Sequence, residues 1–512
     1  MNIKQAKDEI RHTVQAYLTK NALGDYAIPV VRQRPIMLIG PPGIGKTAIM
    51  EQVARECQVA LVAYTITHHT RQSAIGLPYI EKKMFGGKEY AITEYTMSEI
   101  VASIYEKMEA TGLKEGILFI DEINCVSETL APTMLQFLQG KTFGNHKIPE
   151  GWVIVAAGNP PEYNQSVRDF DIVTLDRVKK INVEENYAVW KVYAYENQIH
   201  SAILSYLDIK KENFYQIETT VDGKEIVTAR GWEDLSKLML VYEQLGITVD
   251  EPVILQYIQN RRIAKDFANY LDLYKKYQTD YDVDAVVQGQ VKPSAIDRIQ
   301  KASFDEKLSV INLLISRLTA AFSEVYHKDQ YVRDLYEILK ELKFTLSRAP
   351  EDGSGTIRLL EEKAGQVAAE IDLNKERGLY DASKLQSMKT VLRTLEQYRL
   401  QLIQDDRLHP ADAFAYIKES FAADTAERKH MIGMASAYLE NAFLFMESAF
   451  GESQEMVIFI TELNTNQYCT RFIRDNGSAR YDRYNQSLLF DEKRQNLLKD
   501  IAEVSDFVGF LD

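Results

Sequence analysis

The stretch Ile36-Met37-Leu38-Ile39-Gly40-Pro41-Pro42-Gly43-Ile44-Gly45-Lys46-Thr47 decides the fold. It opens with a short apolar run typical of a buried strand. The residues from Gly40 onward fit the pattern GxxxxGK[ST], in which glycines let successive backbone N–H groups curl inward around phosphate oxygens. An apolar helical face follows in residues 47–57. The segment therefore predicts a strand, a phosphate-binding loop and a helix whose N-terminus faces the anion.

Each residue type in this loop has its own task in holding a nucleotide. The loop backbone is expected to cradle the phosphates of ATP or ADP, and its cofactor-binding residues are Gly40, Pro41, Pro42, Gly43, Ile44, Gly45, Lys46 and Thr47. The Lys46 ammonium group reaches the β- and γ-phosphates, and the Thr47 hydroxyl ligates Mg²⁺.

Three more apolar runs, residues 61–66, 117–120 and 153–157, alternate with helical patterns. This alternation is typical of a buried parallel sheet with helices on both faces. The run at 117–120 ends in Asp121-Glu122, 75 residues after Lys46 for the first carboxylate. An acidic pair in this place is often only a solvated strand end. Beside a phosphate loop, however, Asp121 is expected to hold Mg²⁺ and Glu122 to polarise the attacking water.

Five motifs carry a family resemblance. They are Gly40 to Thr47, Asp121-Glu122-Ile123-Asn124, Ala156-Ala157-Gly158-Asn159-Pro160, Leu175-Asp176-Arg177 and Thr228-Ala229-Arg230. On these residues the chain resembles the MoxR group of AAA+ ATPases over roughly residues 27–274. The resemblance implies an α/β P-loop AAA+ core with a parallel sheet sandwiched by helices. An all-α lid and a mostly α-helical C-terminal extension are expected to follow.

The resemblance also implies roles for three polar side chains. Asn159 is the sensor that helps to place water against the γ-phosphate, and Arg230 begins the second sensor helix in the lid. Arg177 is the arginine finger that reaches the nucleotide of the neighbouring subunit, with Arg168 as its competitor. Simpler roles stay open: Asn159 caps a turn, Arg177 forms a surface ion pair, and Arg230 caps a helix or pairs with Glu233 or Asp234.

Two β-hairpins are expected to project from the sheet. Residues 80–85 and 88–93 flank Gly86-Gly87, and residues 142–148 contain Gly144-Asn145. In the resemblance they correspond to the helix-2 insert and the pre-sensor-1 insert, which face the pore or substrate side of a hexamer.

The whole chain divides into four expected segments. They are a nucleotide-binding core at 1–185, a helical lid at 186–285, a helical extension at 286–410 and a mixed α/β segment at 411–512. The last includes an expected strand at 456–461. In the extension, the apolar spacing predicts separate helices over 308–322 and 332–342.

Composition narrows the class of protein. The net charge of −14 disfavours a nonspecific binder of nucleic acid or of anionic membranes. The three cysteines form no CxxC pair, so a reducing compartment is expected. Neither a signal peptide nor a membrane span is predicted, and we expect a cytoplasmic protein.

These observations lead to one principal hypothesis, a Mg²⁺-dependent ATP hydrolase. The resemblance adds a ring oligomer, expected to be a hexamer, that remodels a protein client in the manner of a chaperone. A protein with a von Willebrand factor A domain is the partner that it suggests. Two alternatives stay open: a nucleotide-gated scaffold or switch with slow turnover, and a nucleic-acid-dependent motor that uses Lys141, His146 and Lys147.

Two further patterns are weaker. The place of Tyr26-Ala27-Ile28 ahead of the first strand suggests contact with the adenine. Aromatic and basic residues crowd together between Tyr468 and Tyr484, where they stack on bases or form a solvated helix face or partner surface.

Overall fold

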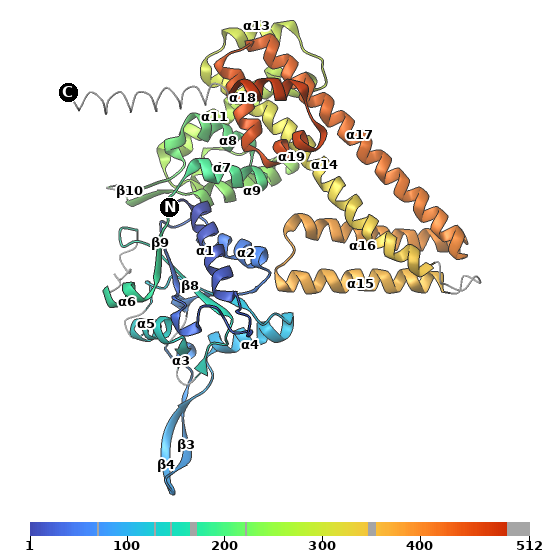
Figure 1. Ribbon diagram of the computed structural model, residues 1–512. Helices are drawn as coiled ribbons and strands as arrows, with labels where there is room; N and C mark the ends of the chain where they lie inside the picture. Colours follow the sequence, from blue (N-terminus) through green and yellow to red (C-terminus); the bar gives the residue numbers. More distant parts are fainter. Residues whose placement is uncertain are drawn as a thin grey trace, which may run out of the picture.

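The computed structural model describes residues 1–68, 71–126, 130–143, 146–163, 172–220, 223–346 and 355–488. These residues form three packed parts, which we call the α/β core, the helical unit and the arm (Figure 1). The α/β core comprises residues 1–182, and the other two parts are built from the elements after it.

A five-stranded parallel sheet forms the centre of the α/β core. Across the sheet the strands are β2 (Ala60–Thr65), β5 (Gly116–Asp121), β8 (Trp152–Gly158), β1 (Ile36–Ile39) and β9 (Lys179–Asn182). All neighbouring pairs are parallel. The first four strands confirm the sequence prediction. β9 was not predicted because Ile181 is its only buried residue, so it has no apolar run.

Helices cover both faces of this sheet. The helices of the α/β core are α1 (Ile3–Leu18), η1 (Val30–Arg32), α2 (Lys46–Cys57), η2 (Ile66–His68), α3 (Arg71–Ile75), α4 (Glu99–Thr111), α5 (Ala131–Gly140) and α6 (Ile172–Arg177). Successive strand residues point to opposite faces, so Leu38 and Phe119 pack with α1 and α2, whereas Met37 and Leu118 pack with α4 and α5. The expected α/β class with a sandwiched parallel sheet is confirmed.

Two antiparallel hairpins interrupt the α/β core. β3 (Pro78–Phe85) and β4 (Lys88–Tyr95) pair along their full length, and Gly86 and Gly87 in the turn both have positive φ angles. This hairpin confirms the prediction and extends far from the rest of the molecule (Figure 1). β6 (Thr142–Phe143) and β7 (His146–Lys147) form the second hairpin, whose predicted turn at 144–145 lies outside the described residues.

The helical unit surrounds one large apolar core. It begins with α7 (Tyr187–Glu196), α8 (Ser201–Ile209), η3 (Lys211–Asn213), α9 (Ala229–Leu245), α10 (Glu251–Tyr257), α11 (Arg261–Tyr281), α12 (Val283–Val287) and α13 (Pro293–Lys301). It also contains an antiparallel hairpin of β10 (Gln216–Thr220) and β11 (Gly223–Val227), so the expectation of an all-α lid was wrong in this detail. The apolar core continues past residue 285 into later helices, and the boundary expected there does not separate two cores.

The arm consists of long helices around a second apolar core. α14 (Phe304–Leu346) and α17 (Pro410–Phe450) run from the helical unit into the arm, and α15 (Thr356–Arg377) and α16 (Ala382–Gln404) complete it (Figure 1). The two helices expected within 308–342 are therefore one continuous helix. Its apolar face changes neighbours along its length, from the core of the helical unit to the core of the arm.

The C-terminal segment is helical in the described residues up to 488. α18 (Gln454–Thr465) occupies the position of the strand expected at 456–461, so the prediction of that strand was wrong. The buried residues of α18 are Met456, Phe459, Ile460 and Leu463, which have helical rather than alternating spacing. α19 (Gln467–Asn476) follows and packs on the same core.

One helix in the described part of the chain, α14, is long and apolar enough to cross a membrane by composition. Its most apolar window is 72% buried inside the protein, as in the core helix of a soluble protein.

Candidate nucleotide site

The phosphate-binding loop runs from the end of β1 to the start of α2, as predicted. Gly43 and Gly45 have φ angles of 74° and 92°, in the left-handed region that glycine adopts without strain. α2 begins at Lys46, so its N-terminus and positive dipole end face the inside of the loop.

The helical unit packs directly against this loop. A Cβ atom on Gly43 would lie 2.9 Å from the Cβ atom of Thr228, which leaves room only for glycine. The Tyr215 hydroxyl donates to the Pro42 carbonyl over 2.9 Å, and the Arg230 N–H donates to the Gly43 carbonyl over 3.2 Å. The loop therefore lies at the junction between the α/β core and the helical unit.

Lys46 is a buried cation, only 8% exposed. Its Nζ donates to the carbonyls of Gly40 and Pro41 over 2.7 and 2.8 Å, and to the Oδ1 atom of Asn159 over 2.8 Å. Burial lowers the pKa of Lys46 to about 8, although the charge of Asp121 opposes the shift. These three acceptors use the three N–H donors of the ammonium group and none of them is charged, so a bound phosphate would replace a neutral acceptor with an anion.

Thr47 and Asp121 meet where β1 and β5 end. The Thr47 hydroxyl donates to the Oδ2 atom of Asp121 over 2.8 Å. A hydroxyl and a carboxylate side by side are oxygen ligands of the kind that Mg²⁺ prefers, next to the loop that would hold phosphates. The residues present therefore fit Mg²⁺ bound between Thr47, Asp121 and the phosphate groups.

Glu122 has an unusual backbone conformation, with a φ angle of 58°. Non-glycine residues rarely adopt this region, and such residues cluster at functional sites. The Thr67 hydroxyl donates to the Oε2 atom of Glu122 over 2.8 Å and fixes the direction of the carboxylate. The sequence analysis missed Thr67. The signal was its place just after β2, beside the carboxyl end of β5.

Asn159 follows β8 and points its side chain at Lys46. Its backbone is held by Asn124, whose Nδ2 donates to the Asn159 carbonyl over 2.7 Å and whose Oδ1 accepts from the Asn159 N–H over 3.3 Å. Asn124 was not predicted to be a site residue, because its position in the sequence does not indicate a contact with the residue that follows β8.

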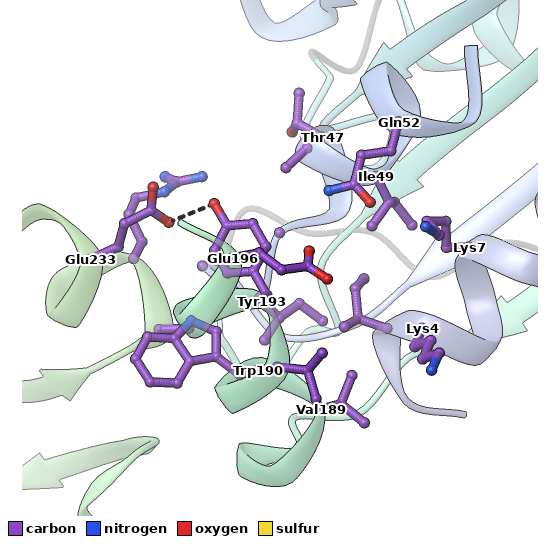
Figure 2. Close-up of a pocket in the computed structure, with 18 of the residues that line it drawn as sticks. Lys4, Lys7, Thr47, Ile49, Gln52, Val189, Trp190, Tyr193, Glu196 and Glu233 are labelled. Atoms are coloured by element: carbon purple, nitrogen blue, oxygen red, sulfur yellow. Dashed lines mark hydrogen bonds between the residues drawn. The ribbon is translucent and has the colours of Figure 1, made fainter. Parts of the chain in front are cut away.

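A cavity of about 450 Å³ adjoins the loop. Figure 2 shows its walls, which come from α1 and α2 of the α/β core and from α7 and α9 of the helical unit. Ile49, Val189 and Trp190 supply apolar surface, and the hydroxyl of Tyr193 donates to Glu233 over 3.3 Å. The cavity opens on Thr47 and Arg230, so it is continuous with the phosphate loop.

The candidate arginines differ in position. Arg230 is exposed to the cavity. The adjacent carboxylates Glu233 and Asp234 both pair with Lys237, and the role of Arg230 stays a prediction. Arg177 is exposed on α6, hydrogen-bonds to Gln139, and is not among the residues that line the cavity. The competing Arg168 lies outside the described residues.

The expectation that Tyr26 lies against the adenine was wrong. Its hydroxyl donates to Glu115 over 3.1 Å and lies against Gly151. Glu115 and Gly151 come just before β5 and β8, at the amino ends of the strands. The phosphate loop is at the opposite, carboxyl edge of the sheet.

Most of the basic residues that suggested nucleic-acid binding make polar contacts within the protein. Lys141 is buried and donates to the Val30 carbonyl over 2.8 Å, while a ring nitrogen of His146 lies 3.0 Å from the Tyr95 carbonyl. In the C-terminal cluster, Arg480 pairs with Glu440 over 2.6 Å. Two of the three hairpin residues therefore do not form part of an exposed basic surface.

Comparison with known proteins bears on the α/β core. Residues 36–177 match the model of the AAA family, described as the ATPase family associated with various cellular activities. This segment fits an AAA+ ATPase. The AAA domain covers less than a third of the chain, from β1 through α6, and includes the phosphate loop, Asp121-Glu122, Asn159 and Arg177. No curated protein matches the chain.

The AAA domain implies ATP-driven activity and nucleotide hydrolysis in general, and it suggests oligomeric assembly. Domains of this family typically bind ATP or ADP with Mg²⁺, which agrees with the oxygen ligands at Thr47 and Asp121. The helical unit beyond residue 182 and the arm lie outside the matched segment.

Proposed function

We propose that this chain hydrolyses ATP to ADP and phosphate in a Mg²⁺-dependent reaction and uses the energy to remodel a protein client. The observation that carries the proposal is the convergence of Lys46, Thr47, Asp121, Glu122 and Asn159 at the carboxyl edge of β1, β5 and β8. Ligands of open parallel sheets bind at this edge.

The reaction requires a base that accepts a proton from water, and positive groups that bind the phosphates. Glu122 accepts a proton from the attacking water, whose oxygen forms a bond to the γ-phosphorus as the bond to the β-phosphate oxygen breaks. Lys46 and the loop N–H groups hold the phosphates, and Asn159 orients the water. Thr47 and Asp121 would hold Mg²⁺, which would supply positive charge to offset the charge on the phosphate oxygens. Arg230 approaches the phosphates from the helical unit.

A ring of subunits completes the proposed site. Arg177 is exposed and outside the cavity of its own chain, which supports a role at the nucleotide of a neighbouring subunit. Arginine suits this role because it keeps its charge and offers a fork of donors to the transferring phosphoryl group. We expect a hexamer, and we assign the chain to the MoxR-like AAA+ proteins.

The client side of the proposal rests on the long hairpin. β3 exposes Ile80 at 78% and Met84 at 65%, which places large apolar side chains on the surface of the projecting hairpin. Such surfaces mark protein interaction sites. The MoxR resemblance adds a partner with a von Willebrand factor A domain and a chaperone-like role in a cytoplasmic setting.

A nucleotide-gated switch is the second proposed function. It is supported by the Thr67–Glu122 hydrogen bond, because a donor at Oε2 sets the direction of the carboxylate, so a partner that moves Thr67 would change the rate of turnover. A switch of this kind binds ATP but turns it over only when a partner binds.

Turnover measured against protein concentration separates the two functions. For an intersubunit ATPase, Mg·ATP hydrolysis per subunit rises with concentration, in parallel with the native mass of the assembly, because each site needs its neighbour's Arg177. Steady-state phosphate release and native mass spectrometry on the same samples measure both quantities. Tight ATP binding without turnover at any concentration would contradict the autonomous ATPase and favour the switch.

A further inference from the structure

We propose that Asn124 is a positioning residue that fixes the distance between Glu122 and Asn159. The proposal rests on the function given above, because both partners act on the attacking water there. Asn124 is only 5% exposed, and its amide contacts both backbone groups of Asn159. It thus joins the loop after β5 to the loop after β8 through a side chain.

The turn that carries Glu122 is also hydrogen-bonded to β8 through its backbone. After Glu122 the Ile123 N–H donates to the Ala157 carbonyl over 2.9 Å, and the Cys125 N–H returns to the Glu122 carbonyl over 2.9 Å. The left-handed backbone at Glu122 costs free energy and persists only where its surroundings hold it. The Asn124 side chain adds two hydrogen bonds from this turn to the backbone of Asn159.

Gly158 shows how closely this amide fits. A Cβ atom on Gly158 would lie 2.4 Å from the Oδ1 atom of Asn124. The residue before the sensor asparagine is therefore a glycine because the Asn124 amide occupies the space. Loss or displacement of the amide frees the Asn159 backbone, and the side chain that reaches Lys46 moves with it.

Asn124→Asp tests this role with almost no change in volume. It keeps an acceptor for the Asn159 N–H but replaces the donor by a carboxylate oxygen that faces the Asn159 carbonyl. We expect kcat for ATP to fall at least tenfold while the Kd for ATP changes less than about twofold. In an Asn159→Ala background the same substitution should change kcat less than twofold, because Asn124 acts through Asn159.

Gly158→Ala gives a second route to the same test should Asn124→Asp fold poorly, since it displaces the amide and leaves Asn124 in place. The positioning role would be overturned if Asn124→Asp lowered kcat equally in the unmodified chain and in Asn159→Ala. Parallel losses of ATP binding and turnover would also overturn it. Absence of turnover in the unmodified protein would instead overturn the proposed function, and the positioning role with it.

A separate observation carries a second inference, at the place where the arm returns to the α/β core. The turn after α15 contacts the C-terminal ends of α4 and α2. Arg377 Nε donates to the Thr111 carbonyl over 2.7 Å, Lys107 Nζ to the Glu376 carbonyl over 2.6 Å, and Arg55 Nε to the Gly378 carbonyl over 3.3 Å. We call these three hydrogen bonds the arm latch.

The latch has a consistent electrostatic basis. Carbonyl groups at a helix C-terminus have no partners within the helix and carry partial negative charge. Arg377 satisfies one at the end of α4, while Lys107 and Arg55 satisfy those at the end of α15. Each helix end therefore receives a cation from the opposite side. The three contacts are all polar, as is common at interfaces between parts that move relative to one another.

The arm latch connects the arm back to the α/β core, so each of the three parts contacts the other two. The arm is rooted in the helical unit through α14 and α17, and the helical unit contacts the phosphate loop through Tyr215 and Arg230. The arm then returns to α2, the helix that begins at Lys46 (Figure 1). The cavity beside the phosphate loop has the α/β core on one wall and the helical unit on the other (Figure 2).

We infer that the arm latch holds the helical unit against the phosphate loop and slows nucleotide release. The cavity must widen for a nucleotide to leave, and widening moves the helical unit away from the α/β core. The latch resists this movement because the arm is fixed to both parts. This inference also rests on the proposed function, which places the nucleotide in the cavity.

Release of a fluorescent ADP analogue from Arg377→Ala tests the latch by stopped-flow fluorescence. We expect dissociation about fivefold faster than in the unmodified chain, and a similar effect from Lys107→Ala. Arg358→Ala is the matched control, since Arg358 is exposed on the same helix and pairs with Glu362 of that helix. An unchanged release rate in both latch variants would overturn the inference.

Hydrogen exchange gives a readout that does not depend on nucleotide. Residues 107–113 should exchange faster in Arg377→Ala than in Arg358→Ala, because the end of α4 loses its partner. Equal exchange in these variants would overturn the latch even if ADP does not bind, whereas failure of ADP to bind to the unmodified chain would overturn the proposed function alone.

Discussion

Glu122→Gln is expected to bind ATP as tightly as the unmodified chain and to hydrolyse it at least 10²-fold more slowly. General-base catalysis contributes roughly 10²–10⁴-fold to a rate, and the amide cannot accept the proton of the attacking water. The substitution preserves shape, and the Thr67 hydroxyl can still donate to the remaining carbonyl oxygen. Phosphate release under saturating Mg·ATP measures the rate, and equilibrium titration with a fluorescent ATP analogue measures affinity.

Glu150→Gln is the matched control for this substitution. Glu150 is exposed and comes before β8, at the amino edge of the sheet, so it should leave both quantities unchanged. If Glu122→Gln turns over ATP at a rate within tenfold of the unmodified chain, Glu122 is not the base and the assignment of the acidic pair is wrong.

Arg177→Ala should lower kcat by 10²-fold or more while the Kd for ATP changes only a few-fold. Arginine fingers act on charge that develops in the transition state and contribute on the order of 10³–10⁵-fold in phosphoryl-transfer enzymes. Arg177 is exposed on α6 and is not in the cavity of its own chain, so the loss should be in turnover rather than in binding.

The control for Arg177 must separate catalysis from assembly. Arg34→Ala removes another exposed arginine of the α/β core. Arg34 lies just before β1, and its loss should leave kcat unchanged. Native mass of the Arg177→Ala protein should match that of the unmodified chain. A loss of assembly that fully accounts for the loss of turnover would count against a finger and in favour of an interface residue.

The central part of the fold and of the site could be predicted because both depend on local sequence. The run Ile36–Ile39 leads directly into the phosphate loop, and the strand that ends in Asp121 is apolar throughout. The strand ends then meet because parallel strands share one carboxyl edge. Contacts between Thr47 and Asp121, and between Lys46 and Asn159, follow from that geometry.

The remainder depended on neighbours that local sequence does not specify. β9 buries only Ile181 and is defined by its pairing with β1. Thr67 and Asn124 act across strands, and their spacing from Glu122 or Asn159 gave no sign of this. α18 was mistaken for a strand because its apolar residues are close together, whereas packing against the helical unit selects their helical spacing.

The arm illustrates a different limit. Apolar periodicity predicted helices at 308–322 and 332–342, but the single helix α14 spans both and serves two cores, and no periodicity shows where one core ends. Its return to the α/β core depends on the backbone carbonyls of Thr111, Glu376 and Gly378, which carry no sequence signal at all.

A mixing experiment tests the central claim, an ATPase site shared between neighbouring subunits, most directly. Glu122→Gln subunits lack the base but carry Arg177, and Arg177→Ala subunits carry Glu122 but lack the arginine. If Arg177 acts on the neighbouring nucleotide, mixed assemblies contain sites with both residues, and ATP hydrolysis should rise at least tenfold above that of either protein alone. Activity of the mixture equal to the average of its two components would contradict the shared site.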